Sequence, residues 1–388
     1  MTQRLTPGMA EATRLTRAGK LAEATALIQQ LLRPSAPVVA DHVAADPAND
    51  AAIEGEFVRL DVATPPSPEA QPTAQPRSRL RETMRRIAAG GMPAARKTAA
   101  PAPGVLPHGA AFRSEVLADA GGPRDYRIYI PASARGKRDL PLVVMLHGCT
   151  QTPEDFATGT GMNALAEEFG CLIAYPAQPG AANANKCWNW FRPEDQGRDK
   201  GEPASLAAVT RRILHDHPVD PGRVYVAGLS AGGAAALIMA DAYPEIFAAV
   251  GVHSGLPLGA AHDIPSAFMA MRNGAAGDRL ARPKPVILFH GDADATVHPR
   301  NARSIVARSL AALPALHAQT EQGRSPGGRA YTRHRHCTAD GVSYCEYWDL
   351  GGAGHAWAGG HAAGSHTDPS GPAASRAMLE FFLQHRAE

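Results

Sequence analysis

From about residue 105 onward, short apolar runs alternate with amphipathic stretches. The apolar runs are rich in Val, Ile, Leu and Tyr, which predicts buried strands at residues 126–130, 142–146, 171–175, 224–227, 248–252, 286–289 and 344–350. The amphipathic stretches predict helices at residues 155–169, 204–216, 232–242, 301–312 and 372–385. This alternation predicts an α/β domain over residues 105–388, with a mainly parallel sheet and helices on both faces.

The chain before residue 105 differs in composition and in its pattern of apolar residues. Residues 1–33 contain apolar positions between residues 8 and 33 that are spaced for an amphipathic N-terminal helix. Residues 34–104 are rich in Pro and Ala ("PPSPEAQPTAQP"), which predicts a disordered linker. Within it, the basic segment 77–91 ("RSRLRETMRRIAAGG") is either a helix that docks on an acidic or amphiphilic surface, or a solvated linker helix.

Composition narrows the function classes. The net charge of +2 over 388 residues argues against nucleic acid as a partner, because such a surface needs a strong basic excess. The sequence has no apolar run of the length that a transmembrane helix needs. The N-terminus does not resemble a secretory signal, so a cytoplasmic location is expected on this ground.

The cysteines form no CxxC pair, so no metal or redox motif is expected. Cys337 and Cys345 flank Asp340-Gly341, which is a turn signal between two strand-like runs. A hairpin there brings the two cysteines near each other. Either a Cys337–Cys345 disulfide or two free thiols is compatible with this pattern.

The run at 224–227 leads into Gly228-Leu229-Ser230-Ala231-Gly232, and a helical pattern follows. A serine on such a tight strand-to-helix turn projects above the sheet, and flanking glycines let strand and helix approach without a Cβ clash. We therefore expect Ser230 to be a nucleophile and the Ala231 N–H to be an oxyanion donor. The alternative is a glycine-rich turn with a small polar residue.

The run at 142–146 ends in His147-Gly148-Cys149. A loop after an early strand can supply the second backbone N–H of an oxyanion hole, and the position after the His-Gly pair makes Cys149 the candidate. We expect the His147 side chain to shape this loop rather than to act as a base.

A late strand at 286–289 is followed by Asp292 and Asp294, which are both placed to orient a catalytic histidine. Asp294 is preferred because it lies farther around the turn, where Val297 can anchor the loop. The other aspartate is expected to hydrogen-bond within the loop.

The strand at 344–350 is followed by a glycine-rich loop that presents His355 ("GGAGHAWAGG"). Competing histidines lie before that strand or in a looser Gly/Ala/Ser segment: His334, His336, His361 and His366. The order Ser230, Asp294, His355 is that of α/β-hydrolases. It predicts an acyl-enzyme mechanism in which Ser230 attacks an ester, His355 transfers the proton and Asp294 orients the imidazole.

Several segments resemble the esterase family of poly(3-hydroxybutyrate) (PHB) depolymerases, whose relatives include feruloyl and acetylxylan esterases. They are "LPLVVMLHGCTQTPEDFATGTGMNALAEEFGCLIAYPAQ", "CWNWF", "VDPGRVYVAGLSAGGAAALIMADAYPEIFAAVGVHSG", "HGDADATV" and "GGAGHAWAGG". The resemblance implies an α/β-hydrolase fold and a serine esterase without metal or cofactor. By position it implies Ser230 as nucleophile, Asp294 as acid, His355 as base, and Cys149 and Ala231 as oxyanion donors.

The resemblance implies short-chain hydroxyalkanoate-type esters, as polymer or oligomer, as the substrate. A feruloyl or acetylxylan esterase is the alternative within this chemistry. An alternative of another class is a granule-associated binding protein that docks through residues 1–33 and carries a vestigial hydrolase domain. Polymer-degrading members of the family are secreted, which favours export, against the cytoplasmic expectation above.

Aromatic residues near the motifs are candidate substrate walls. Trp188 and Trp190 flank a polar residue in "KCWNWF", and Trp357 follows the candidate base by two positions. Core packing is the alternative for these side chains. Cys149 and Cys187 lie in two loops that can meet near the site, so a bridge between them is a further hypothesis.

Overall fold

A computed structural model describes residues 106–119, 122–311, 313 and 316–387. The expected N-terminal helix, the linker and the basic segment 77–91 therefore lie outside the described residues. Among the residues that are described, no helix is both long enough and apolar enough to span a bilayer.

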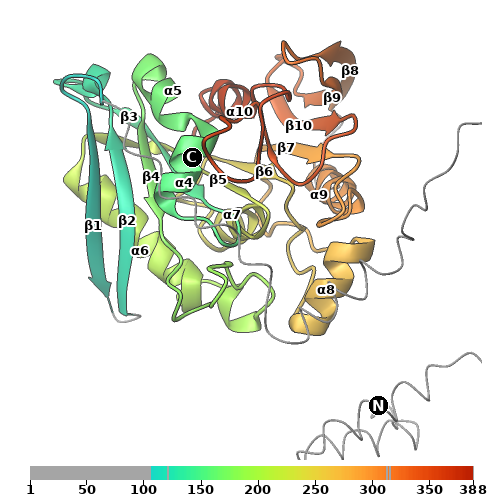
Figure 1. The fold of residues 1–388 in the computed structure, drawn as a ribbon, viewed down its shortest axis with the longest axis horizontal. Helices are drawn as coiled ribbons and strands as arrows, with labels where there is room; N and C mark the ends of the chain where they lie inside the picture. Colours follow the sequence, from blue (N-terminus) through green and yellow to red (C-terminus); the bar gives the residue numbers. More distant parts are fainter. Residues whose placement is uncertain (1–105, 120–121, 312, 314–315, 388) are drawn as a thin grey trace, which may run out of the picture. The chain divides into compact units, whose positions relative to one another are not determined.

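A ten-stranded sheet forms the centre of the fold (Figure 1). In spatial order it consists of β1 (Ala111–Asp119), β2 (Gly122–Ile130), β4 (Leu172–Pro176), β3 (Leu140–Leu146), β5 (Val219–Leu229), β6 (Ala249–His253), β7 (Val286–Gly291), β10 (Ser343–Leu350), β9 (Ala330–Cys337) and β8 (His317–Arg324). Every neighbouring pair from β4 to β10 is parallel, whereas the outer strands pair antiparallel. The central strands are buried on both faces, as a helix-covered parallel sheet requires.

Helices cover the sheet on both faces. One apolar core includes side chains of α6 (Gly201–Asp216), α7 (Ala231–Ala242), α8 (Ile264–Asn273) and α9 (Arg300–Leu310). The core on the opposite face includes side chains of α4 (Pro153–Thr160), α5 (Met162–Phe169) and α10 (Ala374–Phe382). The remaining elements are short: the 3-10 helices η1 (Ala132–Ala134) and η2 (Pro193–Asp195), and the paired strands β11 (Trp357–Ala358) and β12 (Thr367–Asp368).

The predicted strands and helices are all present, with shifted ends. The pattern expected as one helix over 155–169 is two helices, because Gly161 adopts a left-handed conformation (φ 63°) that caps α4. The strands β1 and β8 and the helix α8 were not predicted, and β9 was expected only as the strand-like run before Asp340-Gly341. In β8, nearly every side chain is exposed, so its sequence lacks the apolar alternation that marks a half-buried strand.

The hairpin predicted around Asp340-Gly341 exists, but a Cys337–Cys345 disulfide does not: both thiols are free and buried. Cys337 pairs with Ser343, whereas Cys345 pairs with His336 across a register shift. Residues that face each other across two strands share one face of the sheet, and neighbours along a strand alternate. The two cysteines therefore lie on opposite faces.

A buried carboxylate fastens β10 to β9. Glu346 is 2% exposed and accepts both forks of the Arg333 guanidinium, at 2.9 and 3.0 Å. The indole N–H of Trp348 donates to the same carboxylate at 2.7 Å, and the guanidinium lies over the Trp348 ring. This cluster stabilises β10, and β10 leads directly into the loop that contains His355, the candidate base.

We expect Arg333→Met to destabilise the fold by about 3 kcal/mol, because it leaves the buried Glu346 carboxylate without its cation. Arg335→Met is the matched control two residues along β9, where the guanidinium donates to the exposed side chain of Gln319. It should change stability by less than about 0.5 kcal/mol. Urea unfolding of both variants measures the difference, and equal midpoints would show that the buried pair has no special weight.

Candidate active site

Ser230 occupies a strained turn between β5 and α7. Its backbone has φ 56° and ψ −118°, a conformation that a residue with a side chain rarely adopts. Its N–H donates to the carbonyl of His253 on the neighbouring strand, at 2.8 Å. The side chain thus stands at the carboxyl end of the parallel strands, where α/β sheets bind ligands.

Gly232 and Gly228 make this turn sterically feasible. A Cβ atom on Gly232 would lie 2.0 Å from the carbonyl oxygen of Leu146 on β3, and one on Gly228 would lie 2.3 Å from the backbone of Gly232. Such contacts are impossible for any other residue without moving the strand or the helix. Glycine at these two positions therefore lets the strand and the helix approach each other, as expected from the sequence.

The structure brings Asp294 and His355 together. Nδ1 of His355 lies 2.7 Å from Oδ2 of Asp294, whose side chain is fully buried, whereas the imidazole keeps 13% of its surface exposed. The other carboxylate oxygen of Asp294 accepts the N–H groups of Thr296 and Val297, both at 2.9 Å. The turn after β7 is thereby folded around the carboxylate.

The charge state of this pair follows from its contacts. Burial by itself raises the pKa of Asp294, but hydrogen bonds from His290 and His355 outweigh burial and hold that pKa well below its ordinary value. An ionised carboxylate only accepts, so Nδ1 of His355 donates a proton in this hydrogen bond, which orients the imidazole. Asp292, by contrast, accepts the N–H of Gly352 at 2.7 Å and serves as a loop-bonding residue.

The two candidate oxyanion donors lie in different surroundings. The N–H of Ala231 is the first of α7, and the first N–H groups of a helix have no partner within it. In the loop after β3, Gly148 N–H donates to Gln151 at 2.8 Å and Thr150 N–H donates to Asn185 at 2.7 Å. The N–H groups on either side of the Cys149 N–H are therefore already used in hydrogen bonds within the protein.

His147 is buried beneath this loop and has a structural part, as predicted for its side chain. Its Nδ1–H donates to the carbonyl of Gly148 at 2.8 Å, and its Nε2 accepts the N–H of Gln178 at 3.2 Å. Burial lowers the pKa of His147 to about 4, so the ring is neutral and can hold both bonds at neutral pH.

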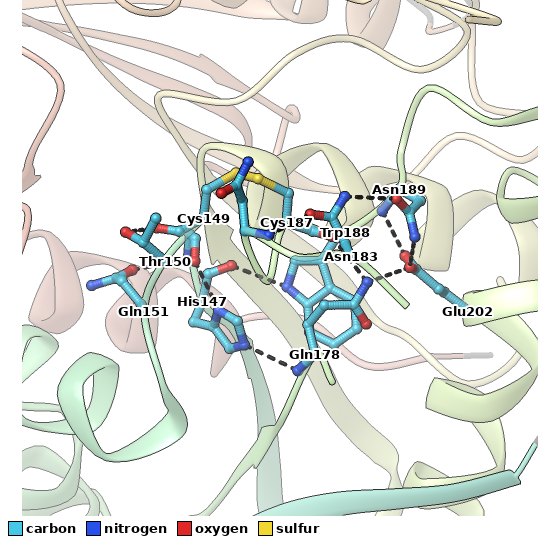
Figure 2. Close-up of a disulfide and its surroundings, with 12 residues drawn as sticks. His147, Cys149, Thr150, Gln151, Gln178, Asn183, Cys187, Trp188, Asn189 and Glu202 are labelled. Atoms are coloured by element: carbon cyan, nitrogen blue, oxygen red, sulfur yellow. Dashed lines mark hydrogen bonds between the residues drawn. A yellow bond between two sulfur atoms is a disulfide. The ribbon is translucent and has the colours of Figure 1, made fainter. Parts of the chain in front are cut away.

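A disulfide joins Cys149 to Cys187, so of the two bridges raised from the sequence the structure contains this one. Figure 2 shows it beside His147 and a polar network that continues through Gln178 to Glu202. The buried Glu202 carboxylate accepts the backbone and side-chain N–H groups of Asn189. The bridge and the network hold the loop of Cys149 against the segment that follows β4.

The three tryptophans predicted as substrate walls are core residues instead. Trp188 is fully buried and donates its indole N–H to the carbonyl of His147. Trp357 is 1% exposed and packs edge-on against Phe156, and Trp190 is 7% exposed within the same core as α6 and α7. Their rings belong to the apolar cores, and core packing is the alternative that the sequence left open.

Two residues of this region carry no sequence motif and were missed. Gln151 accepts from Gly148 and donates to the carbonyl of Ser365, and so ties the loop after β3 to the segment after β11. His253 lies at the end of an apolar strand, where nothing in the local pattern separates a functional histidine from a core residue. Only the paired strands and loops of the folded chain reveal their contacts.

Comparison with known proteins adds to this geometry. The family described as "Esterase PHB depolymerase" matches residues 124–325. Poly(3-hydroxyalkanoate) depolymerase C of Paucimonas lemoignei is 35% identical over 231 residues, which are 56% of this chain and 55% of the relative. Poly(3-hydroxybutyrate) depolymerase of Ralstonia pickettii is 35% identical over 36% of this chain and 30% of the relative. The chain thus spans about half, or less, of these depolymerases.

Relatives with lower sequence identity are named as other esterases. Feruloyl esterase B of Thermothelomyces thermophilus is 28% identical over 50% of this chain and 72% of the relative. Among solved structures, an acetyl xylan esterase from Aspergillus awamori superimposes with a TM-score of 0.53 at 19% identity, over 70% of this chain and 99% of that one. The shared architecture confirms the predicted α/β-hydrolase fold.

The depressed pKa of Asp294 makes stability depend on pH. In the unfolded chain this carboxyl has a pKa of about 3.9. Its contribution to the free energy of unfolding is therefore fully present at neutral pH and is lost as the pH falls through that value toward the lower pKa of the folded state. We expect Asp294→Asn to flatten the loss of stability between about pH 5 and pH 3. Urea midpoints across this range measure the slope. Asp292→Asn is the matched control, and a slope as shallow as that of Asp294→Asn would contradict the assignment.

Proposed function

Because this chain belongs to the PHB depolymerase family of esterases, we propose that it is a serine carboxylic ester hydrolase. Ser230 is the proposed nucleophile, His355 the general base and Asp294 the carboxylate that orients the base. The observation that carries the proposal is the 2.7 Å hydrogen bond between His355 and the buried Asp294, at the carboxyl ends of the strands where Ser230 also stands.

Acylation begins when Ser230 Oγ attacks the carbonyl carbon of the ester while Nε2 of His355 accepts the hydroxyl proton. The carbonyl oxygen becomes an oxyanion and receives the N–H groups of Cys149 and Ala231. The charge on the imidazolium is balanced by Asp294, which its hydrogen bonds keep ionised. The C–O bond to the alcohol then breaks, and His355 donates its proton to the leaving oxygen.

Deacylation repeats these steps with water as the nucleophile. His355 takes a proton from water, the hydroxide attacks the acyl carbon, and the same two N–H groups receive the second oxyanion. Collapse of that intermediate returns the proton to Ser230 Oγ and releases the acid.

For the substrate, we propose short-chain hydroxyalkanoate-type esters. The two depolymerases named above are more similar in sequence (35%) than the feruloyl esterase (28%). Burial of Trp188, Trp190 and Trp357 also removes the aromatic surfaces on which a feruloyl ring could stack at these positions. We further propose that the apolar positions of segment 8–33 bind polymer granules, which rests on their spacing in the sequence alone.

Substitution of the proposed triad should abolish turnover without unfolding the protein. We expect Ser230→Ala and His355→Gln to lower kcat for p-nitrophenyl butyrate by at least about 10³-fold. His361→Gln is a matched control, because this exposed histidine belongs to the competing segment and should leave the rate near that of the native enzyme. Native-like rates for Ser230→Ala would refute the proposal.

The polymer part of the proposal has its own test. We expect full-length enzyme to hydrolyse PHB film and soluble 3-hydroxybutyrate oligomers faster than methyl ferulate or acetylated xylan. Leu27→Glu with Leu31→Glu should reduce sedimentation with film several-fold, because charges at apolar positions oppose adsorption, and should spare oligomer hydrolysis.

Gln29→Glu with Gln30→Glu adds the same charge between those positions and serves as the control. Equal sedimentation of both double variants would exclude docking through this segment. A higher kcat/KM for methyl ferulate or acetylated xylan than for the oligomers would overturn the substrate class.

A further inference from the structure

His253 joins the two halves of the proposed triad. It is the last residue of β6, which lies between β5, the strand that leads into Ser230, and β7, the strand before Asp294. The residue is fully buried, and it has no part in the mechanism above. Its backbone and its ring nevertheless contact both loops on which that mechanism depends.

The backbone of His253 holds the nucleophile turn. Its carbonyl accepts the N–H of Ser230 at 2.8 Å, directly beyond the register pair between Leu229 and His253. This bond continues the β5–β6 ladder by one residue into the strained turn. A backbone hydrogen bond to β6 therefore holds Ser230 in position.

The side chain of His253 holds the loop of the candidate base. Its Nε2 accepts the N–H of Ala358 at 2.9 Å, three residues after His355. Ala358 belongs to the short strand β11, which pairs only with β12 in a sheet separate from the central one. The imidazole thus provides a buried hydrogen bond from the central sheet to the chain segment that presents His355.

The protonation state of His253 suits this bond. Because Nε2 accepts, the ring proton lies on Nδ1, which is 3.1 Å from the hydroxyl of Ser254. Burial, followed by the nearby His290 and His355, holds the pKa of His253 well below its ordinary value, so the ring stays neutral. Phe289 and Trp357 stack on the ring, at centroid distances of 5.7 and 5.1 Å, and fix its plane.

We infer that His253 is a positioning residue that sets the spacing between Ser230 and the loop of His355. This inference rests on the proposed function, because it assigns a purpose to the contacts of the proposed triad. A residue that only filled the core would not need an imidazole, since a buried ring nitrogen without a partner is costly. Here the acceptor nitrogen meets the N–H of Ala358, which links the base loop to β6.

Two side chains of different reach test the inference in the full-length enzyme. His253→Asn is too short to reach Ala358 N–H, whereas the amide oxygen of His253→Gln can approach the position of Nε2. We expect His253→Asn to lower kcat for p-nitrophenyl butyrate about 10- to 100-fold with little change in KM, because misplaced catalytic groups slow the chemical step. His253→Gln should recover most of kcat.

The control must account for loss of folded enzyme. Rates are expressed per site titrated with a fluorophosphonate, and melting temperatures are measured for each variant. Val252→Ala, at the preceding buried position of β6, creates a core defect without a polar contact. It should lower the melting temperature but leave kcat per titrated site unchanged.

The inference is overturned if His253→Asn turns over like the native enzyme per titrated site, or if His253→Gln is as slow as His253→Asn. It is also overturned if Val252→Ala shows the same loss of kcat at equal loss of stability. Ser230→Ala in the same assay separates the two proposals. If that variant is inactive while His253→Asn is fully active, only the role of His253 fails, and if it is active, the proposed function fails.

Discussion

The close approach of β3, β5 and α7 is the constraint on which the site depends. Backbone atoms of Gly228, Gly232 and Leu146 meet at distances that leave no room for a Cβ atom. In this tight turn Ser230 has a positive φ of 56°, a backbone conformation that places its side chain above the sheet. The energy stored in that turn is offset by the surrounding buried strands, so the serine is held rigidly where a flexible loop would let it relax.

The histidines around this turn divide by environment. His147 and His253 are fully buried, stay neutral because burial lowers their pKa, and use a ring nitrogen as an acceptor for a backbone N–H. His355 is partly exposed and bonded to the ionised Asp294. Histidine therefore has a structural role at positions 147 and 253, and in the proposed mechanism it transfers a proton at position 355.

Much of this fold could be predicted because parallel central strands are buried on both faces and stand out as apolar runs. The turn at Ser230 and the loops after β7 and β10 follow such runs, so their residues could be located at one edge of the sheet. Strand β8 could not, because its exposed side chains carry no pattern. The roles of the triad stay predictions, while the pairing of Asp294 with His355 is a contact of the structure.

The errors have a common physical origin. For Cys337 and Cys345 the sequence left a bridge and two free thiols open, because the register shift that sets the thiols on opposite faces is invisible in the sequence. Trp188 and Trp357 resembled substrate walls because proximity along the chain does not reveal which way a ring points. His253 was missed for the complementary reason, since its partners come from the turn after β5 and from a segment about a hundred positions later.

The Cys149–Cys187 bridge also acts on the chain before it folds. It closes a segment of 38 residues, which by the chain-entropy estimate costs the unfolded ensemble about 4 kcal/mol of conformational freedom. The enclosed segment contains α4, α5 and β4, so the bridge restricts the unfolded chain over these three elements. Oxidation of two thiols thus favours both the native fold and the loop geometry that the proposed oxyanion hole requires.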